Sequence, residues 1–156
     1  MKALLILTFF CIQSIVVLSQ DILKGTATNI YDGDTFTLVA EDGTKTKIRI
    51  VGIDAPEKNQ DFGIESRDYA RSILQGKKLT VYLEPGETYG RKLGVVITDN
   101  GLHFNYEMVA NGYAWWYDAY SKDKYLKAAF EKAKSNKLGL WATIDPQAPW
   151  QWRREN

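Results

Sequence analysis

Acidic residues stand at two places in the chain where the backbone is predicted to turn. Asp32 and Asp34 belong to the first turn, and Asp54 and Glu57 belong to the second, which ends a β-branched run that begins at Arg49. Carboxylate oxygens are the ligands that hard cations such as calcium and magnesium prefer. Two carboxylates held close together repel each other unless a positive charge lies between them. The residue types therefore predict a metal site made by the two turns.

A predicted β-hairpin brings the two turns together. Phe36 and Leu38 alternate with their neighbours, as do Ile48 and Ile50, so each run is typical of a half-buried strand. Pairing Phe36 with Ile50 points both apolar sets at one core, because a slip of one residue would turn either set to solvent. This register also pairs Leu38 with Ile48, and it leaves residues 42–44 as a glycine-containing loop.

The predicted register places the acidic residues on one face of the hairpin. Asp34 falls opposite Gly52, and Asp54 is its diagonal neighbour at roughly 7 to 8 Å. We expect Gly52 to leave room for a cation between the carboxylates. Arg49 has the parity of the opposite face, so its guanidinium reaches the carboxylates only through a bulge or strong strand curvature.

The elements that must position these residues follow from the same apolar patterns. The expected strands cover residues 22–30, 35–39, 47–51, 79–83 and 93–97, with a loop at 84–92, and the expected helices cover 64–74, 104–111 and 121–134. One helix thus falls between the third and fourth of five strands. This order predicts an α+β fold: a five-stranded OB-type β-barrel with about three flanking helices. We expect the two tryptophans of the tail, residues 146–156, to fasten it to the barrel.

Residues 1–19 are predicted to be a signal peptide. Lys2 precedes a mostly apolar stretch, and the residues before Gln20 suit a cleavage site. The alternative is an uncleaved membrane anchor, although the apolar stretch is short for a spanning helix. Cys11 is the only cysteine and lies in this segment, so the mature chain has no disulfide. We expect a protein secreted to the extracellular space or the periplasm, with no stable membrane association after the leader is cleaved.

The charge balance of the mature chain excludes one class of protein. The whole chain has 20 Lys and Arg against 19 Asp and Glu, and removal of Lys2 leaves 19 of each, a net charge of zero. A strongly basic nucleic-acid binder is therefore not indicated, and any polyanion must be bound locally. The length of residues 20–156 suits a single domain, which we expect to be monomeric, with its core at about 25–141.

Three motifs together resemble the staphylococcal-nuclease (thermonuclease) family. They are Asp32-Gly33-Asp34-Thr35, the run from Arg49 to Glu57, and Tyr89-Gly90-Arg91. The resemblance covers about residues 25 to 141. It implies an OB-type barrel with flanking helices and a calcium-dependent phosphodiesterase that acts on DNA and RNA and leaves 3′-phosphate products. We expect single-stranded substrates to be favoured.

The resemblance assigns the metal ligands residue by residue. Asp34 and Asp54 match the calcium carboxylates of the family. Ala55 stands where the best-known member has a threonine that binds calcium through its main-chain carbonyl. Because a carbonyl ligand does not depend on the side chain, we expect Ala55 to keep this role.

The resemblance also assigns the catalytic groups. Glu57 matches the general base, which takes a proton from the attacking water and is typically worth about 10² to 10⁴ in rate. Arg49 and Arg91 match the two arginines that hold the scissile phosphate through charge-assisted hydrogen bonds. Tyr89 matches a nucleotide-contacting tyrosine, and Thr88 beside it replaces a lysine of the family.

Several residues have alternative interpretations. Tyr120, with the aromatic cluster at 115–117, is either a stacking platform for bases or part of the helix packing. The Asp32-Gly33 motif alone would suit an ordinary turn. His103, the only histidine, has no task in this chemistry. The rival function is a non-catalytic OB-type module that binds single-stranded nucleic acid or a protein. Such a module predicts the loss of at least one of five charged residues, and all five are present: Asp34, Asp54, Glu57, Arg49 and Arg91.

Overall fold

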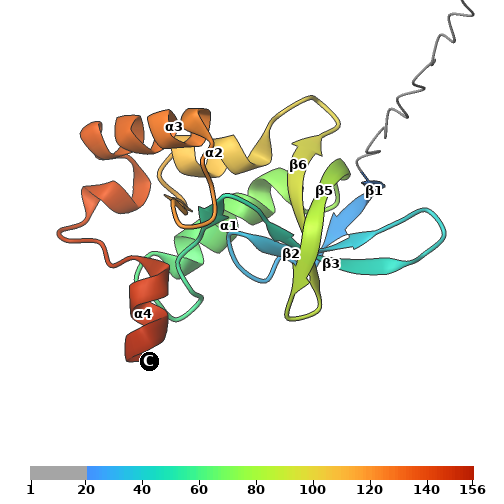
Figure 1. Ribbon diagram of the computed structural model, residues 1–156, viewed down its shortest axis with the longest axis horizontal. Helices are drawn as coiled ribbons and strands as arrows, with labels where there is room; N and C mark the ends of the chain where they lie inside the picture. The colour runs from blue at the N-terminus through green and yellow to red at the C-terminus, as the bar shows by residue number, and fades with distance from the viewer. Residues whose placement is uncertain (1–20) are drawn as a thin grey trace, which may run out of the picture.

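A closed five-stranded barrel forms one side of the molecule, and most of the helices lie on the other side (Figure 1). The computed structural model describes residues 21–156, so the predicted signal peptide and its cleavage lie outside the described residues. The strand order is β1-β2-β3-β6-β5. The bounds are β1 Ile22–Thr28, β2 Thr35–Val39, β3 Lys45–Ile50, β5 Lys78–Thr88 and β6 Arg91–Thr98. β3 and β6 pair in parallel and the other neighbours are antiparallel, which confirms the predicted α+β fold with a five-stranded barrel.

Among residues 21–156, four α-helices accompany the barrel, one more than the sequence predicts. They are α1 Gly63–Leu74, α2 Phe104–Ala110, α3 Lys124–Ser135 and α4 Pro149–Glu155, with a short 3₁₀ helix η1 at Gly139–Ala142. α2 and α3 lie side by side at one end of the barrel, and α4 carries the C-terminus below them in the view of Figure 1. Within residues 21–156, no helix has the length and apolar character needed to cross a membrane.

Helix α3 shows how local sequence sets these elements. Asp123 caps its N-terminus, and the carboxylate accepts hydrogen bonds from the backbone N–H groups of Tyr125 and Leu126 at 2.7 and 3.2 Å. Leu126 and Phe130 lie on the buried face of the helix. The lysines on the other face are solvated, as the apolar spacing predicts.

The register of the β2–β3 hairpin differs from the prediction by two residues. Phe36 pairs with Ile48, and Thr35 pairs with Arg49. The loop is shifted with the register: the backbone N–H of Ala40 donates to the Thr44 carbonyl at 2.9 Å, so this bond encloses residues 41–43. A shift of two residues keeps the same side chains on the same face, so the apolar pattern does not distinguish the two registers.

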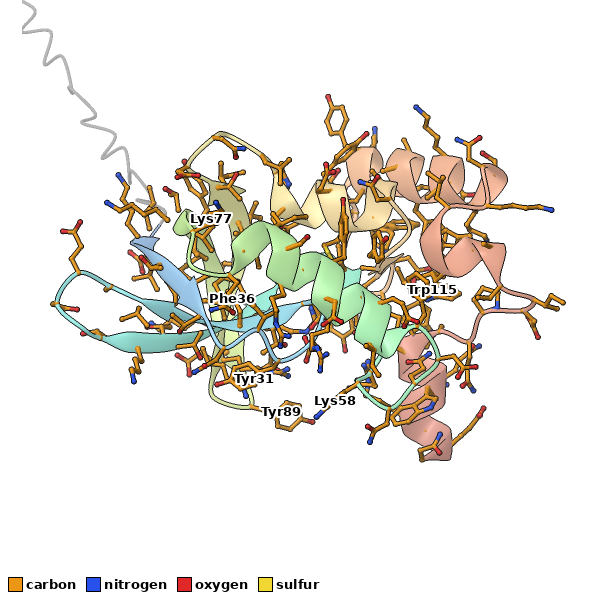
Figure 2. All side chains as sticks on the ribbon, turned by 180° about the vertical axis from the view of Figure 1, so that it is seen from behind. Tyr31, Phe36, Lys58, Lys77, Tyr89 and Trp115 are labelled. Atoms are coloured by element: carbon orange, nitrogen blue, oxygen red, sulfur yellow. The ribbon has the colours of Figure 1, made fainter. Side chains whose placement is uncertain are left out.

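The predicted loop at 84–92 is wrong, because β5 and β6 continue as a hairpin through most of it. Thr88 pairs with Arg91, and a bulge lies between Glu84 and Glu87. Tyr89 and Gly90 form the tight turn, with φ angles of 50° and 70°. Such left-handed pairs are typical of two-residue hairpin turns. Figure 2 shows Tyr89 projecting from the tip of this hairpin, away from the barrel.

A short two-stranded ladder joins the barrel to the helices. β4 Ile53–Asp54 pairs with β7 Trp115–Trp116, so Asp54 lies opposite Trp115. Neither strand is predicted from the sequence, since two residues are too few for a periodic pattern. This ladder places Asp54 between the barrel and the aromatic cluster.

Candidate active site

Arg49 holds the two predicted metal carboxylates together. Its Nη2 lies 3.1 Å from Asp34 Oδ2 and 2.8 Å from Asp54 Oδ1. Both aspartates are buried, with exposures of 5% and 1%. Buried carboxylates need a positive partner. Because one nitrogen reaches both, a single cation can be shared by Asp34 and Asp54.

A sharp turn after β3 brings Arg49 to these carboxylates. The chain reverses at Val51 and Gly52, and Arg49 Nη1 donates to the carbonyls of Ile50 and Ile53, the latter at 2.9 Å. The β2–β3 ladder is regular as far as the pair Thr35 and Arg49. The sequence predicts that a bulge or strand curvature brings the Arg49 guanidinium to the carboxylates. In the structure, the turn after β3 does this instead.

Gly52 does not make room for a cation as predicted. Its φ is +77°, a left-handed conformation that favours glycine. A Cβ atom there would lie 2.9 Å from Cδ1 of Leu126 and 3.3 Å from Oγ of Ser121. Gly52 therefore serves the turn and the close packing of the segment that leads into α3.

Asp34 is fixed by two further hydrogen bonds. The backbone N–H of Ala55 donates to its Oδ2 at 2.7 Å, and the Thr35 hydroxyl donates to its Oδ1 at 3.1 Å. Ala55 itself is buried, and its N–H is committed to Asp34. The carbonyl is then the group of Ala55 that matches the ligand implied by the family resemblance.

Asp32 adds a third acidic group to the turn. Its Oδ1 accepts a hydrogen bond from the backbone N–H of Asp34 at 2.9 Å, so this residue makes the turn that the sequence motif favours. Burial and the neighbouring Asp34 charge raise the pKa of Asp32 to about 7. Ionisation of Asp32 is therefore unfavourable beside Asp34, and a cation bound at this turn would favour its charged form.

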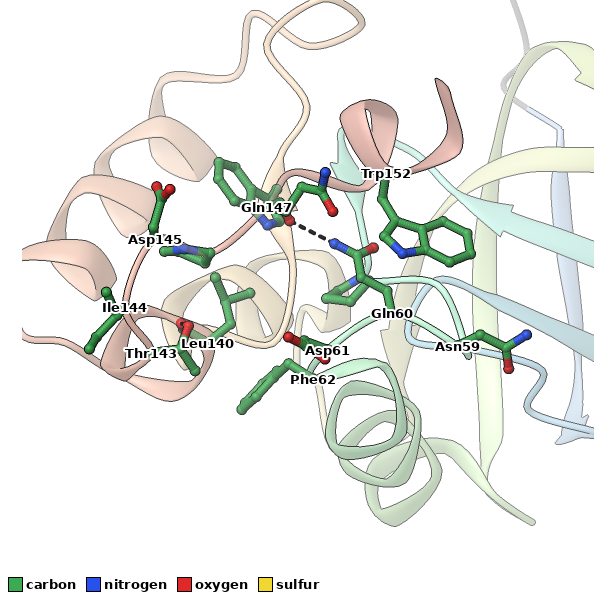
Figure 3. A pocket seen from close by; sticks show the side chains of 13 residues that line it. Asn59, Gln60, Asp61, Phe62, Leu140, Thr143, Ile144, Asp145, Gln147 and Trp152 are labelled. Atoms are coloured by element: carbon green, nitrogen blue, oxygen red, sulfur yellow. Dashed lines mark hydrogen bonds between the residues drawn. The ribbon is translucent and has the colours of Figure 1, made fainter. Parts of the chain in front are cut away.

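Glu57 is positioned from both sides of its loop. Its backbone N–H donates to the side-chain carbonyl of Gln60 at 3.1 Å. Gln60 in turn donates to the main-chain carbonyl of Gln147 at 2.7 Å, drawn as the dashed line in Figure 3. A cavity of about 230 Å³ lies between this loop and the C-terminal segment, with Trp152 on its wall (Figure 3). The loop that carries Glu57 is thus tied to the C-terminal part of the chain.

Arg153 of α4 is the residue of this site that the sequence does not predict. Its Nη2 lies 2.8 Å from Asp54 Oδ2, and its Nη1 lies 2.7 Å from Glu57 Oε1 and 3.3 Å from Asp54 Oδ1. Burial opposes its charge, but the hydrogen bonds to the two carboxylates prevail and raise the pKa of Arg153. The sequence shows only an arginine after two tryptophans, which does not indicate the carboxylates it contacts.

Aromatic packing brings Arg153 to the site. The ring of Trp150 stacks on Tyr117, with centroids 5.0 Å apart and planes within 4°. The same ring meets the edge of Trp115 at 5.4 Å. Trp150 thus fastens the tail to residues 115–117 and not, as the sequence predicts, to the barrel strands, while Trp152 lines the cavity beside Gln60.

Arg91 lies at the rim beside the acidic cluster. Its Nε donates to the Thr88 carbonyl at 3.1 Å, and its Nη1 lies 3.5 Å from the hydroxyl of Thr35, the residue that donates to Asp34. The parallel pairing of β3 with β6 sets Arg49 opposite Leu93, close in sequence to Arg91. The structure therefore brings the two predicted phosphate-binding arginines to the same end of the barrel.

Of the predicted substrate-binding residues, Tyr89 and Thr88 lie at this rim, and Tyr120 lies on the surface beside Tyr117. Tyr89 is 95% exposed, and its ring lies 5.7 Å from the Arg91 guanidinium. Thr88 directly precedes it at the hairpin tip. Tyr120 is 78% exposed, and its ring lies 4.7 Å from that of Tyr117. These side chains are free to contact a ligand.

The rest of the aromatic cluster packs inside the molecule. Trp115 meets the edge of Trp141 at 4.5 Å, and both Trp115 and Trp116 pack on Phe130 of α3. Of the two interpretations open for this cluster, helix packing holds for the tryptophans. His103 caps α2, where its Nδ1 accepts from the Tyr106 N–H at 3.3 Å, which is a structural role.

The donor set suits a hard cation that keeps ligands besides the side chains. No group of three or more Asp, Glu, His and Cys side chains forms a complete metal cage in the part of the chain that the structure describes. Asp34 and Asp54 supply two oxygen-donor side chains, and main-chain carbonyl and water oxygens would complete the shell. Arg49 contacts both carboxylates, and Arg153 contacts that of Asp54, so positive charge is stabilised at the place where a cation would bind.

Comparison with known proteins identifies relatives over most of the chain. The model of the family described as staphylococcal nuclease homologue matches residues 47–143. An uncharacterized endonuclease of Escherichia coli O157:H7 is 42% identical over 137 residues, which are 88% of each chain. An uncharacterized endonuclease of Haemophilus influenzae is 38% identical over 126 residues, 81% of this chain and 70% of the relative.

A plant relative shares the same part of the chain. The probable staphylococcal-like nuclease CAN1 of Oryza sativa subsp. japonica is 40% identical over 111 residues, 71% of this chain and 33% of its own. These matches confirm the family predicted from the three motifs. The chain belongs to the staphylococcal nuclease homologue family and is a hydrolase of its endonuclease class.

Proposed function

We propose that the protein is a secreted, calcium-dependent endonuclease that hydrolyses phosphodiester bonds of DNA and RNA. The observation that carries this proposal is the cluster at one end of the barrel: two buried aspartates that share one guanidinium, with Glu57 close by and Arg91 at the rim. A calcium ion held by Asp34, Asp54 and the Ala55 carbonyl would act as a Lewis acid on a phosphoryl oxygen.

The chain's own residues account for the remaining chemistry. Glu57 takes a proton from a water molecule, whose oxygen forms a bond to phosphorus. The bond from phosphorus to the 5′ oxygen breaks, and that oxygen takes a proton from solvent, which leaves a 3′-phosphate on one product. Arg91 and Arg49 hold the scissile phosphate, Arg49 through the Nη2 group that lies between Asp34 and Asp54, because its Nη1 stays on two carbonyls of the turn. Both planar guanidinium groups stay protonated at any working pH.

The surface tyrosines support an extended, unpaired substrate. Tyr89 and Tyr120 offer exposed rings on which bases can stack, and stacking is worth about 1 to 3 kcal/mol per base. Because every base has an aromatic face, such contacts suit both DNA and RNA. We propose that single strands are cut in preference to duplexes.

Cleavage of single-stranded DNA in the presence of calcium tests the general base. We expect Glu57→Gln to lower the rate by about 10² to 10⁴, because the amide cannot take the proton. Glu65→Gln is the matched control, since Glu65 lies exposed on α1. A wild-type protein that binds the strand without cutting it would instead support the binding module.

Secretion is tested separately from activity. We propose that the leader is removed before Gln20 and that the protein is released to the extracellular space or the periplasm. Mass spectrometry of the protein recovered from an expressing cell should give the mass of residues 20–156. Recovery of the full chain in the membrane fraction would contradict cleavage and support the membrane anchor.

A further inference from the structure

Arg153 occupies the oxygens that calcium and the attacking water would use. Both carboxylate oxygens of Asp54 accept hydrogen bonds from its guanidinium, and Glu57 Oε1 accepts a third. Asp54 Oδ1 is also bound by Arg49. A cation that ligates Asp54 would meet the positive charge of Arg153 within a few ångströms, where two like charges repel strongly.

We propose that Arg153 is a further residue of this site, one that sets the calcium affinity by competing with calcium for Asp54. The inference rests on the proposed calcium-dependent function. Calcium ligates Asp54 only when the guanidinium of Arg153 withdraws, and the same withdrawal frees Glu57 to take a proton from water. Arg153 thus keeps the carboxylates neutralised until calcium replaces it.

The position of Arg153 makes its withdrawal possible. Its side chain is 40% exposed and comes from α4, the last helix of the chain. Its guanidinium binds the side chains of Asp54 and Glu57, and the Tyr117 hydroxyl also faces it. Rotation of the side chain into solvent therefore breaks no contact with the barrel backbone.

Arg49, in contrast to Arg153, is held in the site by contacts with the main chain. Its side chain is 13% exposed, and it also binds two main-chain carbonyls of the turn after β3. Removal of Arg49 from Asp54 would leave these carbonyls without their donor, which carries a desolvation cost. Of the two guanidiniums on Asp54, Arg153 is the one that calcium can displace.

Isothermal titration of the chelator-treated protein with calcium alone tests this inference. We expect Arg153→Gln to bind calcium about tenfold more tightly than the wild type, because a charge-assisted hydrogen-bonded pair no longer opposes binding. Arg154→Gln is the matched control: it removes the same charge from the neighbouring, exposed position and should leave the affinity within about twofold. Equal or weaker calcium binding by Arg153→Gln would overturn the inference.

A second variant and a negative control distinguish failure of the Arg153 inference from failure of the proposed calcium-dependent function. Arg153→Lys keeps the charge but cannot bind both carboxylates in the same planar arrangement, so its affinity should fall between the two. Thermal melting in chelator shows whether each variant is folded, and Arg153→Lys decides the question if Arg153→Gln is not. Asp54→Asn should abolish binding. Absence of calcium binding in every variant would overturn the proposed function together with the inference, whereas wild-type binding unchanged in both Arg153 variants would overturn the inference alone.

Discussion

Two arginines bind the same buried carboxylate from opposite parts of the chain. Arg49 comes from the barrel, is 13% exposed and links Asp54 both to Asp34 and to the main chain of the turn. Arg153 comes from the C-terminal helix, is 40% exposed and binds side chains alone. The difference indicates that the two ion pairs of Asp54 have different roles. Arg49 stabilises the folded site, and Arg153 occupies the oxygens of Asp54 that calcium would bind.

The energetic reason for the difference is burial. Removing one partner of a buried ion pair leaves an uncompensated charge in a poorly solvated place. A pair that is partly open to water is screened and contributes little. Substitutions around Arg49 in the barrel should therefore cost more stability than substitutions at Arg153 in α4.

The largest effect is expected for Arg49→Met. It leaves Asp34 and Asp54 without their shared internal partner, and we expect the free energy of unfolding to fall by about 3 to 5 kcal/mol. Urea denaturation without calcium measures this. The control is Arg71→Met, because Arg71 pairs with Asp68 on the exposed side of α1, where both side chains are about half exposed, and it should change stability by less than about 0.5 kcal/mol. Equal losses for the two variants would contradict the role of Arg49.

Trp150→Ala should come next. The substitution removes the ring that stacks on Tyr117 and contacts Trp115, and we expect a loss of about 2 kcal/mol. The variant should also bind calcium more tightly, since Arg153 is no longer held at Asp54. Calorimetry beside urea denaturation measures both, and weaker calcium binding would show that α4 supports the site instead of covering it.

Gly52→Ala tests the turn that delivers Arg49. The left-handed φ and the contact with Leu126 Cδ1 predict a loss of about 1 to 2 kcal/mol. Because the turn positions the guanidinium, we also expect calcium-dependent cleavage to weaken. Gly43→Ala is the control, with φ +84° and nothing near its Cβ. If both variants lose the same stability, the cost lies in the backbone alone and packing against Leu126 contributes nothing.

The smallest effect on stability is expected for Arg153→Gln. The exposed position of the guanidinium predicts a change below about 1 kcal/mol without calcium. Urea denaturation should therefore separate this variant clearly from Arg49→Met. A loss as large as that of Arg49→Met would remove the distinction between the two arginines.

The sequence predicts the barrel side of the site much better than the α4 side. Alternating apolar residues predict β2 and β3, and the motifs around Asp34 and Asp54 predict that these carboxylates meet. The hairpin register is wrong by two residues, because that shift exchanges no side chain between faces. The turn at Gly52 is interpreted wrongly, because close packing against Leu126 depends on a helix far along the chain.

Arg153 escapes sequence reasoning for a different physical reason. Its helix has seven residues, too few for a clear apolar period, and its place depends on Trp150 stacking on a tyrosine of another segment. The contact with Asp54 spans 99 residues of sequence. Only the packed structure shows which carboxylates this arginine reaches.

The most direct test of the account is cleavage of single-stranded DNA as calcium is raised from a chelated start, with Asp54→Asn measured beside the wild type. We expect no cutting by the wild type in chelator, a rate that rises and saturates with calcium, and no comparable activity for Asp54→Asn at any calcium level. Equal cutting in chelator and in calcium, or full activity of Asp54→Asn, would contradict a calcium site at these carboxylates.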